Sequence, residues 1–596
     1  MESFLIYLLN TFFVVFLICS FFYLSINLVF FLEKKKFLIK SNYNYLAVFF
    51  LFFAILSFIF NLLFYFDLLS KFILKFILCI FYLIFFLSVL LNSQNQKIFK
   101  EFVIFFFILK KKKYNILLIG IFFIISTLPM SDADSLVYFN LPTQLLSFGK
   151  ILSDISYLEN RLISSAELIL LLSFITNFNN FGSILNCICL FFLCSSLAKD
   201  KKFDSILFII STPLIIYFVT SNKLQLFFAI LYFIIFLFLK SIKKFNNFNI
   251  FILSLLIIFF VSGKISNILI ALPITLFFFY RIYKQFFFRT VFFLFLNFIL
   301  IYLPILLKKF QIYGDPFSPF FEFLKNNPDQ VVNQFAYNLR SSQGWLGLTD
   351  FAKIIESTLK IFFPLSISDL TNTLGLGMLL IFFIKFYKLE KKIYILSISN
   401  IILILLTGQI LPRYFIESFL LLSLNFNSLK FDNTKKIFAF IFKIKIFLII
   451  IFSTIYIIYC LYLLYPYTSK KNYLEKLAFT YSYAFQVKKL NLNENVLSLD
   501  VSRKTIFFEK NFFPSSSLVL TNDRLKNLSN FIKIQKIKYL ISRNIDIGVK
   551  NCLDLELITK FNYIEQAKRN FLVPSIESYT YVYKILGFKS DCKFSN

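Results

Sequence analysis

Long runs of apolar residues, separated by short polar segments, fill most of the chain up to about residue 465. An apolar helix of about 20 residues crosses the hydrocarbon core of a bilayer, so these runs predict about fourteen membrane-spanning helices. The predicted spans lie near residues 3–32, 44–66, 69–92, 114–130, 182–198, 204–220, 223–240, 246–262, 265–280, 288–306, 372–386, 392–408, 411–425 and 437–464. The run Leu168–Phe178 is too short to span and is interpreted as an interfacial or re-entrant helix. The first run is too long for a signal peptide and lacks a basic start, so we expect it to be retained.

The last 130 or so residues have a different, mixed and polar pattern. Short β-like runs occur at Val496–Asp500, Tyr539–Ser542, Leu555–Phe561 and Tyr579–Ile585, with a helix-like stretch at Asp523–Gln535. This alternation predicts a small α/β domain. The predicted fold class is therefore a polytopic α-helical membrane protein of about 14 spans with a small C-terminal α/β domain. We divide it into extra N-terminal transmembrane helices (1–113), a transmembrane core (114–465) and the C-terminal domain (466–596).

Basic residues gather in alternate loops between the apolar runs. The clusters lie at Lys34–Lys36, Lys110–Lys113, Lys199–Lys202, Lys240–Lys244, Arg281–Arg289, Lys385–Lys392 and Lys435–Lys436. Cytoplasmic loops carry an excess of Lys and Arg, which places these clusters in the cytoplasm. The opposite loops then lie outside, at 131–164, 220–223, 262–266, 307–355, 408–413 and everything after about 466. The net charge of +31 follows from this arrangement and from contact with anionic lipids, so we expect no nucleic-acid partner.

The cysteines divide into two groups. Six lie in apolar runs and are interpreted as inert packing residues, namely Cys19, Cys79, Cys187, Cys189, Cys194 and Cys460. Cys552 and Cys592 lie in the polar tail. If that tail is outside the cytoplasm, the two are candidates for a disulfide, although spacing alone does not bring them together.

Several common chemistries have no support in the sequence. The chain has no Walker A loop, no HExxH motif, no paired CxxC motif and no histidine, which argues against ATP-driven transport and zinc-peptidase chemistry. What remains is a set of polar residues in the predicted outer loops. These residues form three groups.

The first group is Asp132 and Asp134, directly after the span 114–130. In an extended segment both carboxylates would point to one side, where one could act as a base while the other stays ionised or binds a metal. The alternative is that they only mark a helix end. Tyr138, Phe139 and Leu141 give the following segment an apolar face suited to the membrane surface, and further on are Glu159, Arg161 and Glu167.

The second group is the turn Gly314-Asp315-Pro316, which follows Lys308 and Lys309 and opens a loop of about fifty residues. Trp345 in this loop is interpreted as a membrane-interface anchor. The third group is centred on Arg413, followed by Tyr414, with Lys264 and Lys223 on the same face. Arginine binds phosphate oxygens in a bidentate way, so a lipid phosphate is the expected partner. The alternative is that these side chains only extend towards lipid headgroups.

Taken together, the order of these features resembles the GT-C class of membrane glycosyltransferases, over roughly residues 114–465. The resemblance is carried by an Asp-rich first outer loop, the Gly-Asp-Pro-Phe-x-Pro-Phe turn at 314–320, Leu411-Pro412-Arg413-Tyr414 and a soluble outer domain. It is greatest to bacterial proteins related to the mannosyltransferase and aminoarabinose transferase groups. Two features depart from the class, because about three helices precede its usual first span and no histidine is present.

The resemblance implies an inverting hexosyltransferase in the bacterial cytoplasmic membrane, with polyprenyl-phosphate sugar as donor and a lipid or glycan as acceptor. It implies that Asp132 or Asp134 is the catalytic base or supports a divalent metal, and that Arg413, with Tyr414 and Lys264, contacts the donor phosphate. Tyr138, Asp154, Glu159 and Asp315 are then candidates for the substrate loop. No nucleotide cofactor is needed, and the need for a metal stays open.

Three other functions stay open. A transporter or flippase for lipid-linked glycans would need charged residues near the bilayer midplane, and few occur in the predicted spans, where Lys75 and Glu417 are the examples. A polymerase or ligase of surface polysaccharide would depend on Arg413 and not on Asp132 or Asp134. An inactive assembly partner is the last alternative.

Overall fold

The computed structural model describes residues 2–589. Within that range it leaves out 39–40, 92–93, 112, 177–178, 283–285, 327, 342–350, 365–371, 376–389, 429–432, 465–469, 519–523, 546 and 566–575. The chain divides into two compact units. The first unit holds Met1–Met130, Ile163–Lys308 and Arg340–Tyr462, and the second holds Ser131–Leu162, Lys309–Leu339 and Leu463–Asn596. We describe each unit separately.

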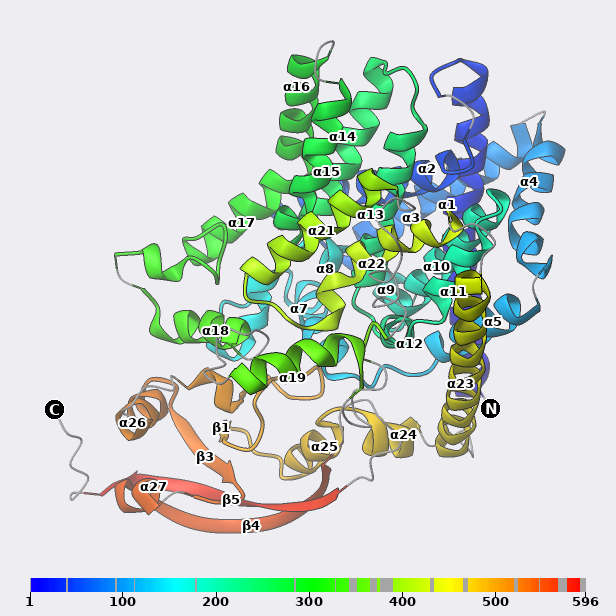
Figure 1. Cartoon of the computed structure of the whole chain (residues 1–596). Helices are drawn as coiled ribbons and strands as arrows, with labels where there is room; N and C mark the ends of the chain where they lie inside the picture. The colour runs from blue at the N-terminus through cyan, green and yellow to red at the C-terminus, as the bar shows by residue number, and fades with distance from the viewer. Residues whose placement is uncertain are drawn as a thin grey trace. The chain divides into compact units, whose positions relative to one another are not determined.

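The first unit is helical (Figure 1). Its earlier helices are α1 (Glu2–Lys34), α2 (Asn44–Tyr65), α3 (Lys71–Leu91), α4 (Asn95–Phe107), α5 (Lys113–Ser126), α8 (Ser165–Ile169), α9 (Leu172–Ile175), α10 (Phe181–Lys199), α11 (Phe203–Ile210) and α12 (Pro213–Thr220). Its later helices are α13 (Gln225–Ser241), α14 (Asn247–Ser262), α15 (Asn267–Ile282), α16 (Phe287–Asn297), α17 (Leu303–Tyr313), α19 (Phe351–Phe362), α21 (Lys391–Leu406), α22 (Ile416–Ser423) and α23 (Asn433–Leu464). Short 3-10 or π segments connect several of them, including the 3-10 turn η8 (Pro412–Phe415).

Several of these helices are long and apolar enough to cross a membrane, which agrees with a membrane protein. Within the described residues there are six, at Ile6–Lys34, Asn44–Tyr65, Lys71–Leu91, Phe181–Lys199, Phe287–Tyr313 and Phe440–Leu464, or seven if a bent pair is one span. Shorter apolar helices occupy other predicted spans, including α13, α14 and α15. The predicted span 372–386 lies largely outside the described residues. The number of about fourteen spans therefore stays a prediction.

The predicted span 204–220 is broken in the structure. Helices α11 and α12 meet at an angle of 69°. Thr212 Oγ1 donates a hydrogen bond to the Phe208 carbonyl over 3.0 Å, and Pro213 begins α12. Proline has no backbone N–H to continue the first helix, but it suits the first turn of the second. The run Leu168–Phe178, expected as one interfacial helix, contains the end of α8 and the four-residue helix α9.

Hydrogen bonds sort the loops of the first unit into two groups, as the charge pattern predicts. The basic loops contact one another through Asn42–Asp200 (2.5 Å), Asn246 to the Phe37 carbonyl (3.1 Å), Arg281 to the Ile242 carbonyl (2.6 Å) and Lys240–Glu390 (2.6 Å). The other loops contact one another through Ser164 to the Gly263 carbonyl (2.7 Å) and through Gln225, the first residue of α13, to the Arg413 carbonyl (2.8 Å). Loops with and without basic clusters thus lie at different helix ends.

Gly182, in the first turn of α10, allows a close contact with Asn222. Its N–H donates to Asn222 Oδ1 over 2.6 Å, and a Cβ at this position would lie 2.1 Å from the Asn222 carbonyl oxygen. Since a backbone atom cannot move aside easily, we expect Gly182→Ala to destabilise the protein by about 1–3 kcal/mol. Thermal unfolding of the detergent-solubilised protein measures the effect. Gly120→Ala in α5 is the matched control, because nothing lies within 4 Å of its Cβ position, and an equal effect of the two changes would contradict the expectation.

The second unit contains a sheet, as the C-terminal pattern predicts. The sheet has five strands. The strands are β1 (Asn495–Ser498), β2 (Phe512–Phe513), β3 (Ile537–Ser542), β4 (Leu553–Glu565) and β5 (Ile576–Phe588), in the order β2-β1-β3-β5-β4. β1 pairs in parallel with β2 and β3, whereas β5 is antiparallel to β3 and β4. The unit's helices are α6 (Ala133–Tyr138), α7 (Asn140–Phe148), α18 (Gln330–Ser341), α24 (Lys470–Leu477), α25 (Tyr481–Lys489), α26 (Arg524–Ile534) and α27 (Ile547–Cys552). The sequence did not predict β2.

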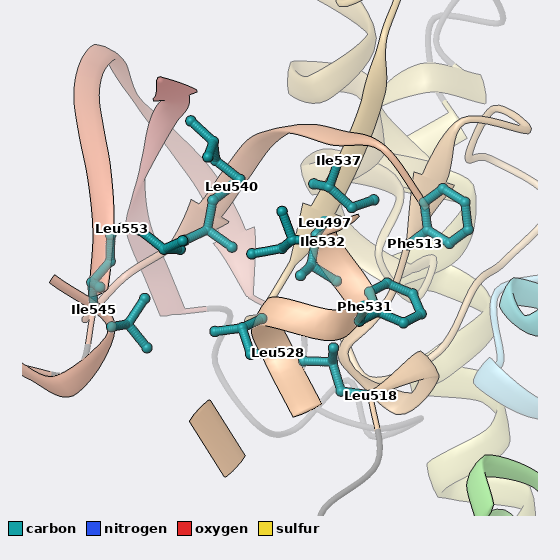
Figure 2. Packing of buried hydrophobic residues seen from close by; sticks show 12 residues of the cluster. Leu497, Phe513, Leu518, Leu528, Phe531, Ile532, Ile537, Leu540, Ile545 and Leu553 are labelled. Carbon is teal, nitrogen blue, oxygen red and sulfur yellow. The ribbon is translucent and has the colours of Figure 1, made fainter. Parts of the chain in front are cut away.

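Two hydrophobic clusters cover the two faces of this sheet. Figure 2 shows Leu528, Phe531 and Ile532 of α26 beside Leu497 and Leu540 of the sheet. The strand residues adjacent to these in β1 and β3 belong to the second cluster, together with residues of α25. Successive strand residues point to opposite faces, so β1 and β3 supply both clusters.

The two predicted outer loops join the C-terminal domain in this unit. The Phe479 N–H donates to the Ser131 carbonyl over 2.9 Å, and the Ile506 N–H donates to the Leu136 carbonyl over 3.3 Å. Leu158, in the first loop, packs with Val332 in the second. Three segments that the charge pattern assigns to one side of the membrane thus form one compact unit.

Candidate functional site

Asp132 is the N-cap of the short helix α6, so it and Asp134 do not lie in an extended segment. Asp132 Oδ1 accepts from the Ser135 N–H over 2.7 Å, and its Oδ2 accepts from the Ser135 hydroxyl over 2.5 Å. Asp134 lies in the first turn of the helix. A helix begins here because a carboxylate satisfies backbone N–H groups that have no partner within the helix. The two aspartates therefore differ, and Asp132 has the structural role that the sequence analysis kept as an alternative.

The cap gives a testable expectation. Asp132→Ala removes the acceptor for Ser135 and should lower the stability of the protein by about 0.5–2 kcal/mol. Asp132→Ser keeps an N-cap oxygen and should retain most of that stability. Thermal unfolding of both variants measures the difference, and an alanine variant as stable as the serine variant would show that the cap contributes nothing.

Asp134 and Glu159 both lie near one arginine of the C-terminal domain. Arg503 Nη1 is 4.0 Å from Asp134 Oδ1, and Arg503 Nε is 3.9 Å from Glu159 Oε1. The Asp134 side chain is 14% exposed and that of Glu159 10%. Within the described part of the chain, Glu159 Oε1 has no hydrogen-bond partner. Burial raises the pKa of the Glu159 carboxyl, and the charge of Arg503 opposes that rise.

The same residues do not fit a metal centre. A divalent ion held by side chains needs several oxygen, nitrogen or sulfur ligands around one point. Among the described residues, no group of three or more His, Cys, Asp and Glu could hold an ion. Arg503 already supplies a positive charge to the two carboxylates, and that charge would repel a cation placed between them.

The apolar residues after Asp134 are buried inside the protein. Phe139, Leu141 and Leu145 are each no more than 3% exposed, and Tyr138, the last residue of α6, is half-buried. The expectation that this segment lies on the membrane surface is therefore wrong. These side chains are buried within the second unit, where Leu136 of α6 and Asn140 of α7 are hydrogen-bonded to the C-terminal domain.

The turn at Gly314-Asp315-Pro316 forms as predicted. Gly314 has φ of +67°, which glycine adopts without steric cost, and Asp315 Oδ1 accepts from the Phe317 N–H over 2.8 Å. Arg161 binds this loop, because its Nη1 donates to Ser318 Oγ over 3.0 Å and its guanidinium carbon lies 4.5 Å from the Tyr313 ring centroid. Asp315 is buried, and its Oδ2 has no hydrogen-bond partner in the described part of the chain.

Asp154 lies in a turn beside Lys504. Its Oδ1 accepts from the Ser156 N–H over 2.9 Å. Lys504 is buried, donates to the Lys510 and Phe512 carbonyls over 2.9 Å each, and lies 4.4 Å from the Tyr157 ring centroid. These contacts give Lys504 a structural role that joins the first outer loop to the C-terminal domain.

Lys504 should make the stability of this unit depend on pH. Burial lowers its pKa from 10.5 to about 7, with Asp154 opposing the change. Between these two values the unfolded chain binds more protons than the folded chain, so stability rises with pH from about 7 to about 10 and is lost again as pH falls towards 7. Thermal unfolding across this range should show the rise in the wild type and a smaller rise in Lys504→Met. Equal slopes in both proteins would contradict the assignment.

The first unit brings Arg413, Tyr414 and Lys264 together, as the sequence predicts. Lys264 Nζ lies 4.4 Å and the Arg413 guanidinium carbon 5.5 Å from the Tyr414 ring centroid. Arg413 Nη1 donates to the Tyr217 hydroxyl over 2.8 Å, and Gln225 Nε2 donates to the Arg413 carbonyl over 2.8 Å. We call Arg413, Tyr414, Lys264 and Tyr217 the cationic cluster.

One carboxylate lies near this cluster, and a second lies near Lys223. Lys264 acts electrostatically on Glu417, which is 3% exposed and whose Oε2 has no hydrogen-bond partner in the described part of the chain. Two basic side chains thus lie around the Tyr414 ring, and one of them, Lys264, acts on Glu417. Lys223 acts on Glu167 in the same way, so its charge is balanced within the protein.

Cys552 is disulfide-bonded, whereas its predicted partner Cys592 lies outside the described residues, as does Trp345. The six cysteines of the apolar runs are free thiols, and four are buried as expected of packing residues, whereas Cys19 is half-buried and Cys79 is exposed. A disulfide in the tail agrees with an oxidising compartment.

Sequence analysis did not identify Arg503 or Tyr217. Arg503 is one of several basic residues in a polar tail, and nothing in the sequence pairs it with residues more than 300 positions earlier. Tyr217 could have been noted, since it stands one turn before the outer loop 220–223. The predicted site residues fall into both units: Asp132, Asp134, Tyr138, Asp154, Glu159 and Asp315 in the second, and Lys264, Arg413 and Tyr414 in the first. Comparison of the chain with family models, with curated proteins and with solved structures gave no match.

Proposed function

We propose that the protein is a membrane glycosyltransferase of the GT-C class that moves a sugar from a polyprenyl-phosphate donor to a lipid or glycan acceptor at the outer face of the bacterial cytoplasmic membrane. The observation that carries the proposal is the cationic cluster. Arg413 and Lys264 are far apart in the sequence, and both side chains lie next to the Tyr414 ring. Two basic side chains, one of them a guanidinium that can bind in a bidentate way, suit the phosphate of a membrane lipid.

For proton transfer we propose Asp134 of the second unit. Asp134 accepts the proton of an acceptor hydroxyl, and the hydroxyl oxygen attacks the anomeric carbon of the donor sugar. The bond between that carbon and the phosphate oxygen breaks, and the polyprenyl phosphate departs with the bonding electrons. Attack from the face opposite the phosphate inverts the anomeric configuration. The step is balanced without a nucleotide or a metal, because the lipid phosphate is the leaving group.

The side of the membrane is supported by two observations. The segments assigned outside by the charge pattern, 131–162 and 309–339, are in one unit with the C-terminal domain. Cys552 in that domain is disulfide-bonded, and disulfides persist mainly outside the cytoplasm. Both observations favour an extracytoplasmic second unit.

Binding of a polyprenyl phosphate to the purified protein tests the donor assignment. The matched ligand is the polyprenol of the same chain length, which lacks only the phosphate. We expect the phosphate to bind at least about tenfold more tightly, because charge-assisted hydrogen bonds contribute about 1.5–3 kcal/mol. Equal affinity for the two lipids would mean that the cationic cluster does not bind the phosphate.

A transporter for lipid-linked glycans is the second candidate, and the bent helix pair α11–α12 favours it. Transporters commonly bind substrate where a membrane helix is interrupted. Lys445 of α23 lies next to this break, since a Cβ on Gly375 would meet Lys445 Nζ at 3.1 Å and Pro213 at 3.4 Å. Movement of lipid-linked glycan across proteoliposomes without cleavage of the sugar–phosphate bond would favour this function over transfer.

A further inference from the structure

Two hydrogen bonds hold the segment 503–506 of the C-terminal domain against the first outer loop, 131–164. Asn140 Nδ2 donates to the Lys504 carbonyl over 3.0 Å, and the Ile506 N–H donates to the Leu136 carbonyl over 3.3 Å. The Lys504 side chain is held by two carbonyls of its own domain. The backbone that carries Arg503 is therefore set in place independently of the Arg503 side chain.

From this backbone Arg503 reaches two carboxylates that come from different parts of the loop. Asp134 lies in α6 and Glu159 in the 3-10 segment Ile155–Leu162, at 4.0 and 3.9 Å from separate nitrogens of the guanidinium. Both distances are those of ion pairs and are longer than a hydrogen bond, so Arg503 acts on the two carboxylates through its charge. A buried carboxylate such as Glu159 is costly without a cation nearby.

We propose that Arg503 is a positioning residue, through which the C-terminal domain holds Asp134 in place for activation of the acceptor hydroxyl while balancing the charge of Glu159. The inference rests on the proposed transferase function for the role of Asp134, but not for the contact itself. It makes the C-terminal domain part of the reacting site. A domain that only covered the membrane core would not need to supply this charge.

Modification of Glu159 by dicyclohexylcarbodiimide, which reacts with protonated carboxyl groups, tests the contact without an activity assay. The full-length protein is labelled over a range of pH, and the extent at Glu159 is read by peptide mass spectrometry. The charged groups around Glu159 and its segment are Arg503, Asp134, Asp154, Lys504, Arg161 and Asp329. Of these, Arg503→Gln removes the cation nearest to Glu159, so we expect the labelling midpoint to rise by about one pH unit or more.

Two variants serve as controls. Arg503→Lys keeps the charge and should leave the midpoint within about 0.5 pH unit of the wild type. Lys488→Gln removes a charge from an exposed pair with Glu509 in the same domain and should have no effect. A midpoint in Arg503→Gln equal to that of the wild type overturns the proposal.

The turnover of the same variants separates positioning from simple stability. In Arg503→Gln the sugar-transfer rate should fall at least about tenfold while the Kd for polyprenyl phosphate stays unchanged. If this variant does not fold, Arg503→Lys decides the matter, because an ammonium group cannot contact both carboxylates in the guanidinium geometry. A reduced rate in Arg503→Lys at unchanged Kd supports the proposal, and a wild-type rate overturns it. If the wild type itself shows no transfer, the proposed function fails, whereas the labelling shift still decides whether Arg503 controls Glu159.

Discussion

Replacing Asp134 with asparagine should lower the rate of sugar transfer about 10²- to 10⁴-fold, the usual contribution of a positioned general base. Asparagine keeps the size of the side chain but cannot accept a proton at the pH of the assay. Binding of polyprenyl phosphate should remain at the wild-type level, since Asp134 is not part of the cationic cluster. Release of polyprenyl phosphate from a labelled donor, measured beside the lipid Kd, gives both quantities.

Asp132→Ser is the matched control for this change. It alters the neighbouring aspartate of the same motif while keeping a side-chain oxygen at the N-cap of α6. We expect its transfer rate to stay within a few-fold of the wild type. A large loss in Asp132→Ser together with normal transfer in Asp134→Asn would reverse the roles of the two aspartates.

The second large effect should come from Arg413→Ala, which removes the bidentate donor of the cationic cluster. The Kd for polyprenyl phosphate should rise about 10- to 100-fold, because hydrogen bonds to a charged group contribute about 1.5–3 kcal/mol. Binding of the matching polyprenol should not change. Affinities measured with both lipids, for the variant and for the wild type, separate loss of the phosphate contact from loss of the lipid-chain contact.

Arg289→Ala is the control for Arg413→Ala. Arg289 lies in the first turn of α16 and donates to Asn247 Oδ1 over 2.9 Å, at a helix end that carries none of the cationic cluster. If the affinity for polyprenyl phosphate falls equally in both variants, the effect is one of general positive charge. The donor assignment would then be lost.

The helices could be predicted from the sequence where a single apolar run forms a single helix. This holds for α2, α3 and α10, whose bounds agree with the predicted spans within two or three residues. It fails at 204–220, where the polar pair Ser211 and Thr212 and the proline that follows interrupt a run that stays apolar on average. It also fails for α4 (Asn95–Phe107), whose apolar residues follow a polar first turn and were assigned to a loop.

The candidate site was only partly predictable for a related reason. Arg413, Tyr414 and Lys264 were found because a basic residue in an outer loop departs from the charge pattern, and the structure places them around one ring. Arg503 shows no such departure, because basic residues are common in the polar tail. The sequence also gives no means of separating Asp132 from Asp134, since the difference arises only when α6 begins at Ala133. Local patterns therefore identify chemical groups, whereas the pairing of distant segments decides their roles.

The most direct test of the account is release of polyprenyl phosphate from polyprenyl-phosphate hexoses by the protein in liposomes, in the presence of envelope lipids and glycans as acceptors. We expect release that depends on the acceptor, a product of inverted anomeric configuration, and loss of both in Asp134→Asn. If the wild type binds the donors but releases no polyprenyl phosphate above the level of Asp134→Asn, the protein is not a glycosyltransferase of this kind, and transport of the lipid-linked sugar becomes the leading function.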